Sequence, residues 1–128
     1  MTTDLEMLVW ATALALVQML IAVAGAQAQL GLPRLAGNRD ELPPLDGWAG
    51  RSQRAHRNML ESLVLFAIAV LTAEVTGRAN ELTALGAMLF FWGRVAYAVV
   101  YVAGVPWLRT LVWAVSTAGI VLVLSQLF

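Results

Sequence analysis

The chain has 128 residues, of which 60% are hydrophobic and 12% are charged, and its mean hydropathy is +0.76. A soluble globular domain carries roughly twice that share of charge, so the composition excludes a soluble fold and indicates one small integral membrane domain. The formal net charge of zero argues against a nucleic-acid surface, and the absence of cysteine excludes disulfides, thiolate metal sites and a cysteine nucleophile.

Four long apolar segments follow one another along the chain, at about 5–32, 58–77, 81–103 and 106–128. Each has about 20 residues or more, enough for an α-helix to cross a hydrocarbon core of about 30 Å. Backbone groups inside lipid must be hydrogen-bonded within the chain, so we expect all four segments to be helices. The sequence therefore predicts an all-α integral membrane four-helix bundle that forms a single domain over residues 1–128.

The connections between these segments differ in kind. Residues 33–57 are expected to form a long loop, which holds three of the four prolines and five of the eight arginines. A tight turn at 77–80 joins the second and third spans, and Gly104-Val105-Pro106 ends the third span and opens the fourth. The positive-inside rule places the long loop in the cytoplasm and both termini on the opposite side of the membrane.

An arginine, an amide and a carboxylate stand at the entrance to the second span. Arg54, Asn58 and Glu61 are spaced i, i+4 and i+7, which places them on one face of a helix. This helix then runs directly into apolar sequence. Ionisable groups inside a membrane cost about 2.5–3.5 kcal/mol each on insertion scales and commonly mark a functional interior.

The third span carries a second polar stripe, because Arg94, Tyr97 and Tyr101 are spaced i, i+3 and i+7. Arg94 lies too far from either end of the span to reach water easily, so it requires a partner. The second and third spans form a hairpin, in which Glu61 reaches a comparable depth. We therefore expect an ion pair between Glu61 and Arg94.

These residues alone leave two interpretations open. In the first, the polar groups hold the helices together, with Glu61–Arg94 as a structural ion pair and Asn58 as an interhelical hydrogen bond. In the second, they form a cytoplasmic site for an anionic molecule, in which arginines bind carboxylates, Glu61 binds an ammonium group and Asn58 an amide. His56 is the only histidine and is expected to serve hydrogen bonding or the interface, and no metal site is expected.

The segments RAHRNMLE at Arg54–Glu61 and GRVAYAVVY at Gly93–Tyr101, followed by Arg109, resemble the MAPEG family (membrane-associated proteins in eicosanoid and glutathione metabolism). The resemblance covers most of the chain and is strongest over residues 51–109. It is closest to the microsomal glutathione transferase and microsomal prostaglandin E synthase branches. It implies a homotrimer that binds glutathione as co-substrate between neighbouring subunits, at the cytoplasmic side.

The same resemblance implies roles for individual residues. Arg94 matches the residue nearest the thiol in relatives, where a positive charge stabilises the thiolate that attacks an electrophile or peroxide arriving from the bilayer. Two departures, Ser62 in place of a tyrosine and Val95 in place of a serine, argue against one specific eicosanoid reaction. The resemblance implies Arg94, Arg109 and Arg34 as catalytic residues, and Arg54, His56, Asn58, Glu61, Arg94, Tyr97 and Tyr101 as glutathione-binding residues.

The function predicted is that of a glutathione transferase or peroxidase acting on lipophilic electrophiles or lipid hydroperoxides. Membrane lipid and a lipophilic small molecule are its expected partners, and nucleic acid is not. The first alternative is a non-catalytic membrane protein with the same fold that binds a lipid or another small anion. The second is a transporter or channel subunit, which the nearly wholly apolar stretch 111–124 disfavours because it offers no continuous polar path.

Overall fold

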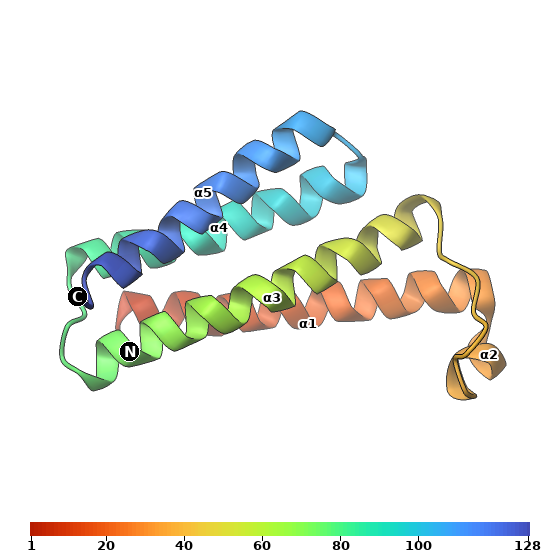
Figure 1. Ribbon diagram of the computed structural model, residues 1–128, viewed down its shortest axis with the longest axis horizontal. Helices are drawn as coiled ribbons and strands as arrows, with labels where there is room; N and C mark the ends of the chain where they lie inside the picture. Colours follow the sequence, from red (N-terminus) through yellow and green to blue (C-terminus); the bar gives the residue numbers. More distant parts are fainter.

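The computed structural model describes residues 1–128 as an all-α chain (Figure 1). Its helices are α1 (Thr3–Leu30), α2 (Leu32–Ala36), α3 (Gly47–Val75), α4 (Glu81–Ala103) and α5 (Pro106–Ser125). The four long helices, α1, α3, α4 and α5, are each long and apolar enough to cross a membrane. The all-α class and the four apolar helices predicted from the sequence are therefore confirmed.

The bounds of α4 coincide with the third predicted span because both of its ends are encoded locally. The Asn80 side chain accepts hydrogen bonds from the backbone N–H groups of Leu82 and Thr83, and the Thr83 hydroxyl accepts one from the Asn80 N–H. This reciprocal arrangement is a capping box. At the other end Gly104 has a φ of +82°, which ends the helix, and Pro106 then opens α5.

The predicted loop over 33–57 differs from the structure, in which most of that stretch is helical. α1 ends at Leu30, residues 32–36 form α2, and α3 begins at Gly47, well before the predicted second span. The start of α3 packs closely on α1, since a Cβ at Gly25 would lie 2.8 Å from the Ala49 Cβ. This contact between small residues stabilises a polar stretch as helix, and only residues 37–46 connect α2 to α3.

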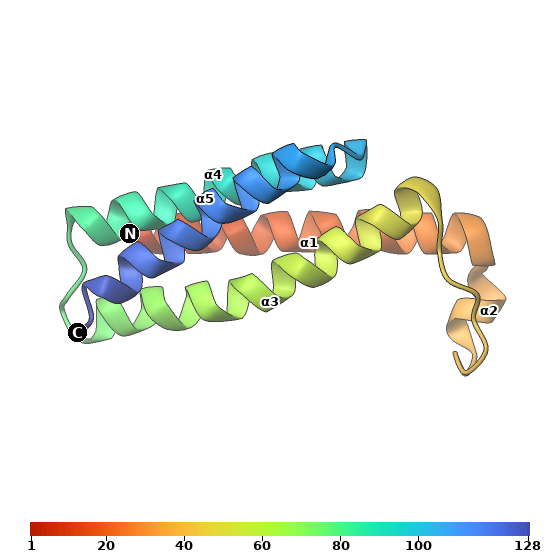
Figure 2. The ribbon, with the colours of Figure 1, turned by 45° about the horizontal axis from the view of Figure 1, so that its top comes forward.

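The long helices form two antiparallel pairs, α1 with α3 and α4 with α5, and α4 also packs against α1 and α3 (Figures 1 and 2). Both termini and the α3–α4 turn lie at one end of the bundle, whereas the 37–46 connection and the α4–α5 turn lie toward the other (Figure 1). The axis of α5 diverges from that of α3 toward the α4–α5 turn (Figure 1). Side chains of α3, α4 and α5 near this turn therefore lie where the backbones of α3 and α5 are furthest apart (Figure 1).

The hydrophobic core is centred on two stacked phenylalanine rings. The centroids of Phe66 and Phe90 are 4.0 Å apart with an interplanar angle of 18°, and both side chains are fully buried. The large side chains of Met59, Val70 and Val123 are also fully buried in this core. Many large apolar side chains on the outer faces of all four long helices are exposed, as expected where lipid rather than water is the solvent.

Small residues bring the backbones of α4 and α5 into direct contact. A Cβ at Gly119 would lie 2.4 Å from the Gly86 carbonyl oxygen and 2.7 Å from the Phe90 nitrogen. A Cβ at Gly93 would lie 2.9 Å from the Ser116 Cβ. Close backbone approach at small residues is a common way for helices to associate in lipid.

We expect Gly119→Ala to lower the free energy of unfolding by about 1–3 kcal/mol, because the added methyl group meets backbone atoms that cannot move aside cheaply. Unfolding of the detergent-solubilised protein, followed by circular dichroism, measures the effect. Gly37→Ala is the matched control, since its φ is −85° and its Cβ would meet nothing closer than the Pro33 carbonyl oxygen at 3.5 Å. Superimposable unfolding curves for the two variants would contradict the proposed contact.

Candidate functional site

Arginine and tyrosine side chains from three helices meet near the α4–α5 turn. Arg54 Nε on α3 donates a hydrogen bond of 3.1 Å to the Tyr101 hydroxyl on α4. The Arg94 Cζ lies 4.1 Å from the Tyr97 ring centre, and the Arg109 Cζ on α5 lies 5.0 Å from the Tyr101 ring centre. The two tyrosine ring centroids are 5.4 Å apart. These five residues are called the arginine–tyrosine cluster below.

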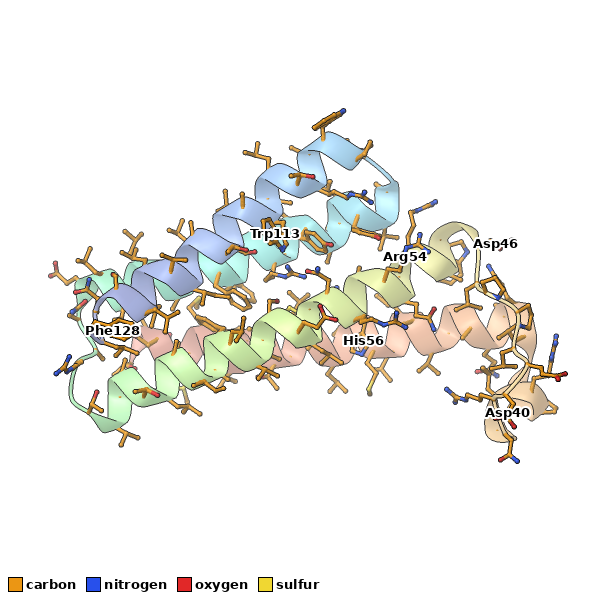
Figure 3. All side chains as sticks on the ribbon, in the orientation of Figure 1. Asp40, Asp46, Arg54, His56, Trp113 and Phe128 are labelled. Atoms are coloured by element: carbon orange, nitrogen blue, oxygen red, sulfur yellow. The ribbon has the colours of Figure 1, made fainter.

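Figure 3 shows where Arg54 of the cluster and the nearby Trp113 lie in the bundle. Arg54 projects from α3 on the side of the α4–α5 pair, and Trp113 lies on α5 across from it. Arg54 and Arg109 are exposed, Tyr101 is half-buried, and Tyr97 is buried. The cluster therefore runs from an open rim into the bundle interior, where Arg94 lies.

Arg94 is the most unusual group in the structure, because a guanidinium that is only 1% exposed has no hydrogen-bond partner on any of its three nitrogens. Its close contact with the Tyr97 ring is a cation–π interaction, which contributes about 2 kcal/mol when desolvated. Leaving a buried charge without a partner costs several kcal/mol, so the ring compensates only in part. Arg94 thus keeps its full capacity to bind an oxyanion in a planar, two-point fashion.

The predicted ion pair between Glu61 and Arg94 is wrong. Glu61 occupies an exposed position on α3, whereas Arg94 points into the bundle and forms no hydrogen bond. Met59, two residues before Glu61, is fully buried, and two residues correspond to about 200° around a helix. The hairpin topology indicated a comparable depth for the two side chains, but the Glu61 carboxylate is exposed, on the same face of α3 as Arg54 and turned away from the buried Met59.

Asn58 lies one helical turn after Arg54 on α3 and is half-buried. Its Oδ1 atom is buried and has no hydrogen-bond partner. The interhelical hydrogen bond expected for Asn58 as a purely structural residue is therefore not made through this oxygen. Asn58 adds an available acceptor beside the arginine–tyrosine cluster.

Two of the predicted site residues lie elsewhere in the chain. His56 lines a separate cavity of about 390 Å³ together with Gln53 and with residues of α1 and the α2 region, Arg39 among them. Arg34 is exposed on α2, within the stretch predicted to be loop, and α2 packs only against α1. A single chain therefore does not bring Arg34 or His56 to the arginine–tyrosine cluster.

The structure adds residues that the sequence interpretation did not include. Thr110 and Trp113 line a cavity of about 120 Å³ with Tyr97 and Arg109. Trp113 follows Arg109 at i+4, so helical periodicity counted from Arg109 is the signal that would have found it. Arg51 Nε donates a 2.9 Å hydrogen bond to the Val102 carbonyl oxygen and so ties the start of α3 to the end of α4.

The electrostatic character of the cluster is that of an anion site. Its three guanidinium groups belong to Arg54, Arg94 and Arg109, and no arginine in the structure donates a hydrogen bond to a carboxylate. Arginine suits planar oxyanions better than lysine, because its fixed donor geometry matches a carboxylate or phosphate at two points. The cluster can therefore bind a small molecule that carries one or more carboxylates.

The sequence model of the MAPEG family matches residues 7–128, and the chain belongs to this family. Neither the curated proteins nor the solved structures contain a match to it. Family membership and the four long apolar helices together make it an integral, multi-pass membrane protein.

We expect Arg94→Leu to raise the free energy of unfolding by about 1–3 kcal/mol, because it removes a buried charge whose donors are unsatisfied. Chemical unfolding in one detergent, followed by circular dichroism, provides the measurement. Arg57→Leu on the exposed side of α3 is the control and should shift stability by less than about 0.5 kcal/mol. A marked loss of stability in Arg94→Leu would show that the guanidinium supports the fold rather than a ligand.

Proposed function

We propose that this protein forms a homotrimer that binds glutathione and transfers its thiol to lipophilic electrophiles, or uses it to reduce lipid hydroperoxides. The observation that supports this most is the unpaired guanidinium of Arg94, buried at the inner end of the arginine–tyrosine cluster. Membership of the MAPEG family supports glutathione as the ligand.

The charged groups of glutathione are opposite in sign to those of Arg54, Arg109 and Glu61. The tripeptide carries two carboxylates, one ammonium group and a thiol. Arg54 and Arg109 on the open rim are suited to its carboxylates, and Tyr101 between them offers a hydroxyl and a flat wall. Glu61 is exposed and not bound to Arg94, so its carboxylate is available for the ammonium group.

Arg94 is the residue we propose for the chemistry. A guanidinium beside the sulfur stabilises the thiolate, and this effect is strong where water is excluded. In transfer, the thiolate sulfur forms a bond to an electrophilic carbon of the second substrate, and a leaving group departs from that carbon with its bonding electron pair; at an activated double bond, the π electron pair moves to the neighbouring carbon, which then takes a proton. In peroxide reduction, sulfur takes the terminal oxygen and an alcohol leaves, after which a second glutathione reduces the sulfenic acid to a disulfide and water. Neither route requires a protein nucleophile.

A site shared between subunits accounts for the two separated groups of predicted residues. The arginine–tyrosine cluster occupies the α3–α4–α5 side of the chain, whereas Arg34 and His56 belong to the side formed by α1, α2 and α3. A closed ring of identical subunits joins two different faces of the same chain. In a trimer, Arg34 and His56 of one subunit would complete the cluster of the next.

We expect glutathione to bind the detergent-purified protein and Arg94→Leu to weaken its affinity about 10- to 100-fold, the effect of losing charge-assisted hydrogen bonds. Isothermal titration calorimetry measures the affinity, and light scattering after gel filtration checks that both proteins have the same mass. Arg78→Leu is the control, because Arg78 hydrogen-bonds to the Leu127 carbonyl at the other end of the bundle.

Two outcomes of this titration would contradict the proposal. One is unchanged affinity in Arg94→Leu, and the other is no heat from the wild type up to on the order of 10 mM glutathione. Turnover is then measured with a chlorodinitrobenzene and with a fatty acid hydroperoxide. Glutathione binding without turnover of either would favour the non-catalytic alternative.

A mixing experiment tests whether two subunits build each site. We expect Arg94→Leu and Arg34→Leu each to weaken glutathione binding when present in all subunits. In every trimer that contains both variants, about one site in three combines the intact Arg94 of one variant with the intact Arg34 of the other. Calorimetry of the tagged mixed trimers should recover that fraction of wild-type sites. Failure to recover any such sites would contradict a shared site.

A further inference from the structure

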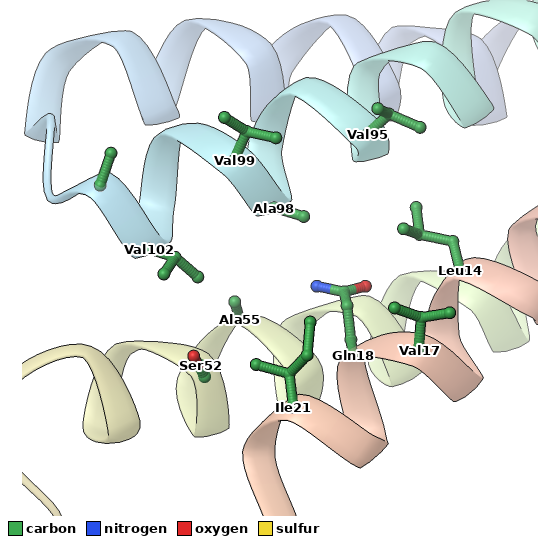
Figure 4. Close-up of a pocket in the computed structure, with 11 residues that line it drawn as sticks. Leu14, Val17, Gln18, Ile21, Ser52, Ala55, Val95, Ala98, Val99 and Val102 are labelled. Atoms are coloured by element: carbon green, nitrogen blue, oxygen red, sulfur yellow. The ribbon is translucent and has the colours of Figure 1, made fainter. Parts of the chain in front are cut away.

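A second cavity, with a volume of about 520 Å³, lies between α1, α3 and α4 (Figure 4). Nine of its eleven lining residues are hydrophobic, and none is charged. Val17 and Val99 at its margin are exposed, so the cavity opens sideways onto the apolar outer surface of the bundle. A molecule can therefore enter it from the hydrocarbon without crossing an aqueous phase.

Two polar side chains inside this cavity have no partner within the chain. Gln18 is 7% exposed and its buried Oε1 forms no hydrogen bond, and Ser52 is 3% exposed with an unpaired Oγ. Figure 4 shows the Gln18 amide pointing into the space between α1 and α4, and Ser52 on α3 beyond Ala55 and Ile21. Unpaired polar groups are costly in an apolar setting, which favours a ligand that supplies a hydrogen bond.

We propose that this cavity binds a neutral single-chain lipid whose hydroxyl group hydrogen-bonds to Gln18. A charged head group is disfavoured, because no lining residue would neutralise it. Ser52 lies toward the end of the cavity near Val102, close to the last residue of α4, and Gln18 lies opposite the stretch of α4 between Ala98 and Val95 (Figure 4). From Val102 to Val95 the helix rises about 10 Å, enough to hold the first part of an alkyl chain.

This site is separate from the arginine–tyrosine cluster, although both use α4. Tyr97 and Tyr101 project from one face of that helix, whereas Ala98 and Val102 line the cavity from another. Gln18 contributes nothing to the cluster. The proposal therefore does not depend on the proposed glutathione chemistry.

Photolabelling in lipid nanodiscs tests the proposal with two probes that differ by one functional group. One probe is decanol with a diazirine near the end of its chain, and the other is the matching decane. We expect the alcohol to label α1 around Gln18 and α4 around Ala98 about five to ten times more than the alkane, the selectivity of roughly one hydrogen bond. Mass spectrometry of peptides locates the label.

Variants separate the hydrogen bond from the shape of the cavity. Gln18→Leu should reduce labelling by the alcohol to the level of the alkane and leave glutathione affinity unchanged. Ala98→Phe should fill the cavity and reduce labelling by both probes, and Ala24→Phe on the exposed side of α1 is its matched control.

Two results would overturn the proposal. One is equal labelling by alcohol and alkane, spread over the outer faces of all four long helices, which would indicate general contact with lipid. The other is unchanged selectivity for the alcohol in Gln18→Leu. That result alone overturns the proposal, even if Ala98→Phe does not fold. Glutathione affinity of Gln18→Leu is measured in a separate titration. A negative labelling result therefore does not contradict glutathione binding at the arginine–tyrosine cluster.

Discussion

A guanidinium group held inside a membrane protein without a counter-charge is the constraint on which the site depends. Arg94 is fixed by its backbone position on α4 and by the Tyr97 ring, and neither of these neutralises it. Charges at such positions are expensive, so a sequence without use for one would be expected to replace it with an apolar residue. The other arginines and tyrosines of the cluster lie between this buried charge and an open rim, from which an anion can enter.

The ends of α4 show how much of the fold was predictable. Asn80, Gly104 and Pro106 encode its bounds within a few residues, so the sequence alone placed them correctly. The start of α3 was not predictable in this way, because its polar first turns are helical through packing of Ala49 against Gly25 on α1. That contact joins residues far apart in the chain, and hydropathy along the sequence does not report it.

In the candidate site, too, the contacts within one helix were predictable and the contacts between helices were not. Spacing along one helix correctly grouped Arg94 with Tyr97 and Tyr101, because side chains at i, i+3 and i+7 share a face wherever the helix lies. To predict whether Glu61 pairs with Arg94, one must know how α3 is rotated about its own axis. The burial of Met59 sets that rotation, and it was not accessible from the polar residues considered alone.

The absence of the Glu61–Arg94 pair favours a ligand-binding role for these charges over a purely structural one. A structural ion pair would satisfy both groups and leave little for a ligand. In the structure the carboxylate is exposed and the guanidinium is buried and free, so each keeps its charge for another molecule. A ligand that carries carboxylates at some atoms and an ammonium group at another satisfies both. The ligand we propose would account for an acid and a base that the chain retains near the membrane without joining them.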